Sequence, residues 1–135
     1  MTLFGLEKSA LAARIFEAPM GTMMRGGPVE IRLTPSWYQV LTPTVPMPAY
    51  NEVAVSAFEP SLEDAEIEAR IDAVFAEYAA LGTDFKWCVG PTTAPADMAQ
   101  RLQARGCTSW GAVGMACDPQ RTEVKAPADV VVHEV

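Results

Sequence analysis

The segment that decides the fold is Phe85-Lys-Trp-Cys-Val-Gly-Pro-Thr-Thr-Ala-Pro, which residues 96–106 follow. Its first five residues are mostly bulky or apolar, as β-strands favour, and Gly90-Pro91 ends the run. A second apolar run, Trp110–Cys117, is also predicted to be a strand. The order indicates a strand–helix–strand unit that closes one side of an α/β domain.

A short amphipathic helix is predicted over residues 96–105, between these two strands. Pro95 suits its first position, because the fixed φ of proline is already helical and its missing N–H costs nothing there. Two apolar residues lie four positions apart on one face: Met98 and Leu102. Two basic side chains are expected to point to solvent: Arg101 and Arg105. Gly106 supplies the left-handed residue that commonly ends a helix.

Upstream, the sequence predicts a first helix followed by three strands. Leu3–Ala18 carries leucines and an isoleucine at helical spacing. The strands are expected at Val29–Leu33, Trp37–Leu41 and Glu52–Phe58, with a Met- and Gly-rich loop before the first. The three prolines of Thr42–Pro48 predict a rigid, extended connection between the second and third strands.

The longest helix is predicted between Ser61 and Gly82. Ser61 is expected as its N-cap, with Asp64 completing a capping box. Apolar residues recur at helical spacing and predict one buried stripe: Ile67, Ile71, Val74, Phe75 and Tyr78. The charged residues are interpreted as a solvated helix face rather than as acid–base machinery: Glu63, Glu66, Glu68, Arg70 and Asp72.

Composition predicts one acidic domain over residues 1–135, with 50% hydrophobic residues. There are 17 acidic residues against 10 Lys and Arg, which gives a formal charge of -7. Nucleic acid and anionic membranes are therefore poor partners, because binding phosphates needs clustered basic side chains. No run approaches the ~20 apolar residues of a membrane span, and charges replace the apolar part of a signal peptide. We expect a cytoplasmic protein.

Three cysteines and one histidine give little basis for metal or thiol chemistry: Cys88, Cys107, Cys117 and His133. No C-x-x-C pair occurs, so no metal site is expected. Cys88, at the mouth of a strand, is a candidate nucleophile, and His133 could serve as its base only if the C-terminal tail folded back. Packing as a small hydrophobe is the favoured interpretation of Cys88.

The succession of Val-Pro-Met-Pro-Ala-Tyr-Asn-Glu-Val (45–53), the long helix, and the residues at 85–91, 96–102, 105–107 and 114–115 resembles the N-terminal half of tandem GNAT-type N-acetyltransferases. The resemblance covers most of residues 29–118. It implies an α/β domain of the α+β type, with a GNAT-like central mixed, largely antiparallel sheet flanked by helices. Residues 129–135 look like the opening strand of the second half, so residues 124–135 are expected to be a tail or a strand of a following half-domain.

In the GNAT fold, a glycine-rich Q/R-x-x-G-x-G/A loop between a strand and the long helix receives the pyrophosphate of acetyl-coenzyme A. Here the corresponding residues 57–64 read Ala-Phe-Glu-Pro-Ser-Leu-Glu-Asp, with no glycine and no basic residue. Pro60 also removes one N–H donor. Each carboxylate within roughly 6 Å would oppose each phosphate charge by about 3 kcal/mol. Conventional acetyl-coenzyme A binding is therefore not expected, and no cofactor is assigned.

Two functions remain open from the sequence. In the first, the chain is a non-catalytic GNAT-like half that shapes an acceptor site or supports a catalytic half on another chain. In the second, it is a stand-alone module that binds a small ligand or dimerises, because an uncovered sheet edge tends to pair with a copy or a partner. An active acyltransferase with an unrecognised donor site ranks third.

The candidate substrate-binding residues combine aromatic rings with one amide: Trp37, Tyr38, Asn51 and Trp87. Buried aromatic side chains beside a polar group can hold an organic ligand, although ordinary core packing is the favoured alternative for all four. Asn51 follows the proline-rich turn, where an amide can bond either exposed backbone or a ligand. No catalytic residue is assigned.

Overall fold

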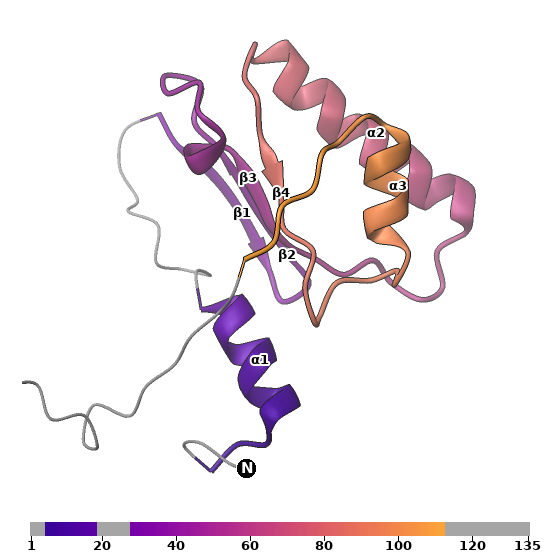
Figure 1. The fold of residues 1–135 in the computed structure, drawn as a ribbon. Coiled ribbons are helices and arrows are strands. Elements are labelled where there is room, and N and C mark those ends of the chain that lie inside the picture. The colour runs from indigo at the N-terminus through magenta and orange to yellow at the C-terminus, as the bar shows by residue number, and fades with distance from the viewer. Residues whose placement is uncertain (1–4, 19–27, 113–135) are drawn as a thin grey trace, which may run out of the picture.

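The computed structural model describes residues 5–18 and 28–112 of the chain (Figure 1). These residues form a mixed α+β structure. In chain order its elements are α1 (Lys8–Glu17), β1 (Glu30–Thr34), β2 (Trp37–Leu41), the 3-10 turn η1 (Pro48–Tyr50), β3 (Glu52–Ser56), α2 (Asp64–Ala80), β4 (Lys86–Trp87) and α3 (Met98–Ala104).

The described strands form one mixed sheet in the order β1-β2-β3-β4. β1 and β2 pair as an antiparallel hairpin, and β2 pairs with β3 in the same way. β4 runs parallel to β3, and α2 makes the crossover between them. The prediction of a mixed, largely antiparallel sheet flanked by helices is therefore confirmed.

A bulge in β3 sets which side chains face which side of the sheet. Tyr38 pairs with Val55 and Gln39 pairs with Val53, so Ala54 is the extra residue. One extra residue shifts the alternation of side chains by one position. Val53 therefore packs beside α2, whereas Ala54 and Val55 both join Tyr38 in the cluster on the other face.

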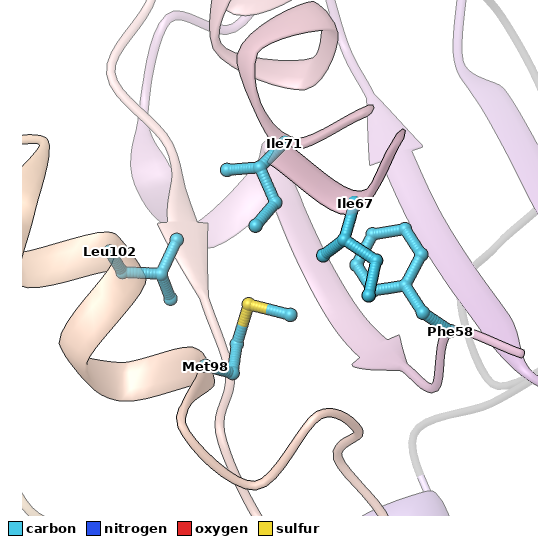
Figure 2. Packing of buried hydrophobic residues seen from close by; sticks show 5 residues of the cluster. All are labelled: Phe58, Ile67, Ile71, Met98 and Leu102. Atoms are coloured by element: carbon cyan, nitrogen blue, oxygen red, sulfur yellow. The ribbon is translucent and has the colours of Figure 1, made fainter. Parts of the chain in front are cut away.

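α2 and α3 cover one face of the sheet (Figure 1). Figure 2 shows the centre of this layer, where one aromatic ring and aliphatic side chains from both helices converge: Phe58, Ile67, Ile71, Met98 and Leu102. Their burial confirms the apolar stripes predicted for both helices. A second cluster continues the layer with Leu41, Val53, Val74 and Tyr78, where the Tyr78 hydroxyl donates to the Val40 carbonyl at 2.8 Å.

The other face of the sheet is contacted by α1 through Phe16, which the sequence analysis did not single out. Phe16 packs on the cluster formed by Tyr38, Val40, Ala54 and Val55. Its ring also lies over Gly90, where an added Cβ would come within 2.4 Å of the ring. Any larger residue at position 90 would therefore force the Phe16 ring or the local backbone to shift.

Several predicted boundaries shift. α2 begins at Asp64 after Glu63, whose N–H donates to Glu66 Oε2 at 3.2 Å, so Ser61 is not its N-cap. Ser61 instead lies in the turn that the hydrogen bond from Leu62 to Glu59 closes. Two S/T/E-x-x-D/E patterns overlap here, and the sequence alone did not separate them.

The strand and the helix predicted in residues 85–106 are both shorter than expected. β4 holds only Lys86 and Trp87, although the Cys88 N–H continues the ladder to the Val53 carbonyl at 2.8 Å. α3 starts at Met98, three residues after Pro95. Gly82 and Gly106 adopt φ of 64° and 86°, as their predicted helix-ending roles require.

Some predicted features lie wholly or partly outside the described residues. Residues 110–112 are not in a strand, and the rest of the strand predicted at Trp110–Cys117 lies outside the described residues. The same holds for Leu3, for most of the Met- and Gly-rich loop at 19–28 and for the tail at 124–135.

Arg101 and Arg105 do not point to solvent. Their side chains are 13% and 17% exposed and form ion pairs across to α2. Arg101 pairs with Asp64 at 2.7 Å and also with Glu68, and Arg105 pairs with Asp72 at 2.7 Å. The prediction was wrong because the acidic partners lie on another helix, more than thirty residues away.

Candidate functional site

A cleft of about 320 Å³ opens between the β1–β2 hairpin and α2. Its walls combine aromatic, aliphatic and charged side chains from both layers: Arg32, Trp37, Gln39, Phe58, Arg70, Ala73, Val74 and Glu77. This volume is at the lower end of the range for small-molecule sites, about 300–1,000 Å³.

The hairpin places one wall of the cleft. Arg32 lies directly opposite Gln39 in the β1–β2 register, and Trp37 lies two residues before Gln39 on the same strand. Side chains two residues apart on a strand share a face, as do directly paired residues on neighbouring strands. All three side chains therefore face α2.

Polar groups of the cleft form a continuous chain of hydrogen bonds, here called the relay. The Trp37 indole N–H donates to Gln39 Oε1 at 3.1 Å, and Gln39 Nε2 donates to Glu77 Oε2 at 3.1 Å. Arg32 Nη1 donates to Glu77 Oε1 at 2.6 Å, and Arg32 Nε donates to Glu30 at 2.7 Å. The hydrogen bond with Glu77 is the main reason why the pKa of Arg32 is raised. The relay fixes the orientation of the indole and of the Glu77 carboxylate.

The wall from α2 follows helical spacing. Arg70, Ala73, Val74 and Glu77 lie three or four residues apart and so share one face of the helix. Val74 is buried against the sheet, whereas Arg70 and Ala73 are exposed at the rim. The floor between these walls is aromatic, because Trp37 and Phe58 pack with ring centroids 5.6 Å apart.

The structure distributes the four predicted substrate-binding residues over three places. Trp37 lines the cleft, and the Trp87 ring packs edge-on against the Trp37 ring with centroids 5.8 Å apart. The Trp87 indole N–H donates to Ser56 Oγ at 2.9 Å. Tyr38 lies in the cluster on the opposite face of the sheet. Only the two tryptophans are therefore brought together.

Asn51 is fully buried at the base of the proline-rich loop. Its Oδ1 accepts from the Thr42 N–H at 2.8 Å, and its Nδ2 donates to the carbonyls of Val45 and Met47 at 2.7 and 3.1 Å. Nδ2 also lies 3.3 Å from Thr83 Oγ1. Of the two partners expected for this amide, exposed backbone is the one present here, and the amide holds the 42–50 loop on β3.

Trp37 is the one cleft residue that was predicted as a site, and the other seven were not: Arg32, Gln39, Phe58, Arg70, Ala73, Val74 and Glu77. Gln39 carried a usable signal, because a polar residue within an otherwise apolar strand needs a partner when it is buried. Arg32 gave none, since it falls on the charged positions of an alternating strand. Arg70 and Glu77 gave none, since any charged residue on a long acidic helix reads as solvated surface.

The turn between β3 and α2 is occupied by its own backbone contacts. Ala57 N–H donates to the Ser36 carbonyl at 2.8 Å and Phe58 N–H to the Ala94 carbonyl at 3.1 Å. Further along, the Leu62 N–H donates to the Glu59 carbonyl at 3.1 Å. Together with the Glu63 N–H in the Glu66 capping contact, four amides of this turn already have acceptors.

Burial affects both cysteines within residues 5–18 and 28–112. Cys88 is half-buried, and burial raises the pKa of its thiol, which disfavours the nucleophilic thiolate. Burial also raises the pKa of Cys107. This part of the chain holds no group of three His, Cys, Asp or Glu side chains placed to bind a metal ion. Cys117 and His133 lie outside it.

Comparison with known proteins adds no family assignment. No protein-family model matches the chain, and no curated protein or solved structure matches it significantly. In the described part of the chain, no helix combines the length and the apolar character needed to cross a membrane.

Proposed function

We propose that the chain is a GNAT-like domain that does not hold acetyl-coenzyme A at the β3–α2 turn and that binds a small organic molecule in the cleft between the β1–β2 hairpin and α2. The order of elements supports the family part of this proposal. An antiparallel meander, a long crossover helix, a parallel strand and a short helix follow one another, as the resemblance implies.

The occupied β3–α2 turn is the observation that carries the proposal. A pyrophosphate cradle needs free backbone N–H groups that converge on the anion. Here the amides of Ala57, Phe58, Leu62 and Glu63 are already bonded within the chain. The exposed carboxylates of this turn, Glu59, Glu63, Asp64 and Glu66, would also repel a phosphate.

In the proposed role, the cleft holds or shapes the acceptor while a catalytic half on another chain supplies the donor. The cleft is suited to this role because it combines an aromatic floor with fixed polar groups at one end. Such a domain would work in the cytoplasm as a partner of a catalytic GNAT half or as a homodimer.

The stand-alone binding module is the second candidate. It is favoured by the make-up of the cleft, because the sheet and α2 of the same chain supply both its aromatic floor and its polar groups. Both candidates require the same ligand site, and they differ in whether a catalytic half is bound.

Isothermal titration calorimetry with acetyl-coenzyme A tests the proposal. We expect no saturable heat at several temperatures, with injections into buffer as the control. Micromolar binding would contradict the proposal and would make an acyltransferase with an unusual donor site the leading interpretation.

A further inference from the structure

Every carboxylate of α2 has a bonding partner, whereas the one arginine of this helix forms no ion pair in the described residues. All five of its carboxylates have partners: Asp64, Glu66, Glu68, Asp72 and Glu77. Three of them bind the arginines of α3, Glu66 binds the Glu63 N–H, and Glu77 binds Arg32. Within the described residues, Arg70 forms no ion pair.

Arg70 lies where its unpaired charge is available to the cleft. Glu66 lies one turn earlier on the same helix, where an i,i+4 ion pair with Arg70 would be usual. Its carboxylate is instead used at the N-terminus of the helix. Arg70 lines the cleft together with Phe58 and Val74, so its guanidinium stands at the edge of an apolar, aromatic floor.

Arg32, the other arginine of the cleft, has its charge satisfied. It pairs with Glu77 at 2.6 Å and with Glu30 at 2.7 Å. An anion entering the cleft therefore meets one guanidinium, that of Arg70, which is not already held in an ion pair within the described residues. A guanidinium binds a planar carboxylate through paired N–H donors, and this geometry is stronger than a neutral hydrogen bond.

From these contacts we propose that the cleft binds a small aromatic carboxylate, whose anionic group is held by Arg70 and whose ring packs on Trp37 and Phe58. This inference rests on the proposed function, because it names the ligand class of the same cleft. The polar groups of the Trp37–Gln39–Glu77 relay are already bonded to one another, so Arg70 is the charged group left to bind the ligand.

The test compares a matched acid and amide by NMR on the full chain. Indole-3-acetate and indole-3-acetamide are titrated separately while the backbone amides of Arg70, Ala73 and Val74 are followed. We expect saturable shifts with the acid, about tenfold weaker binding of the neutral amide, and a loss of this preference in Arg70→Gln. Arg14→Gln removes one exposed charge from α1 and should leave the affinity unchanged.

A second variant fills the cleft without removing any charge. Ala73 is exposed on α2 and lines the cleft, so Ala73→Phe should abolish binding of the acid while the helix keeps its fold. Ala79→Phe adds the same ring at an exposed position of α2 that does not line the cleft, and should bind normally.

Several results would overturn the inference: no saturable shift with the acid, equal affinity for acid and amide, or unchanged binding in Arg70→Gln or Ala73→Phe. Failure of the proposed function is separate, because it would appear as binding of acetyl-coenzyme A. If neither compound binds, only the inferred ligand class is rejected.

Discussion

Replacing Asn51 with alanine should destabilise the domain more than its single side chain would indicate. The substitution removes the acceptor of the buried Thr42 N–H and the donor to the carbonyls of Val45 and Met47. At about 1 kcal/mol for each of these three bonds, we expect a loss of about 3 kcal/mol in the free energy of unfolding. Thr42 contributes most, since its buried N–H cannot reach water, whereas the Met47 carbonyl belongs to an exposed residue.

Urea unfolding followed by far-UV circular dichroism measures this loss from the shift in midpoint at constant slope. Gln103→Ala, an amide truncation at an exposed position of α3, is the matched control and should change stability by less than about 0.5 kcal/mol. Limited proteolysis should also cut within residues 42–50 sooner in Asn51→Ala. A loss below about 1 kcal/mol, with the loop equally resistant, would refute the account of Asn51 as the residue that holds the proline-rich loop.

Three further results are expected. Burial raises the pKa of the Tyr78 hydroxyl above its ordinary value of 10.0, so the unfolded state loses this proton at lower pH than the folded state and stability should fall as pH rises above that value. Urea midpoints measured over a pH series should fall less steeply in Tyr78→Phe than in the unaltered chain. Equal slopes in the two proteins would contradict this. Gly90→Ala should lower the melting temperature because the added Cβ meets the Phe16 ring. In the Phe16→Ala background, the same substitution should lower the melting temperature much less. An equal decrease in both backgrounds would rule out the contact. Cys88 should react with iodoacetamide more slowly than a free thiol at pH 7–8, as measured by peptide mass spectrometry, because burial raises its pKa; reaction at the rate of a free thiol would be contrary evidence.

The elements with a strong local pattern were predicted well from the sequence. β2 has the predicted bounds, Trp37–Leu41, and four of the five residues of the apolar stripe of α2 are buried, whereas Phe75 is half-buried. The stripe follows from helical periodicity and β2 from its bulky, strand-favouring residues, and both signals are local. Gly82 and Gly106 likewise end their helices with positive φ, because this conformation strongly favours glycine.

Features that depend on distant partners were not predictable in the same way. The amphipathic pattern of α3 puts Arg101 and Arg105 on its polar face and so predicts solvent for both, whereas the acids of α2 become their neighbours only after folding. The bulge at Ala54 leaves no mark in a strand that is buried along its whole length. Without alternation, the sequence could not indicate which face each side chain takes.

The candidate site shows the same limit. Trp37 was identified from its residue type, but its cleft partners Arg70 and Glu77 come from a helix that begins more than twenty residues later. Asn51 was identified from its position after a proline-rich turn, and that position also explains its contacts with the loop backbone.

An amide-resolved titration with acetyl-coenzyme A tests the central claim most directly. The backbone signals of Ala57, Phe58, Leu62 and Glu63 report on the turn where the pyrophosphate would be held. The account predicts that these four signals stay in place at millimolar ligand, since their N–H groups are bonded and the nearby charges are negative. Saturable shifts centred on these amides would contradict it.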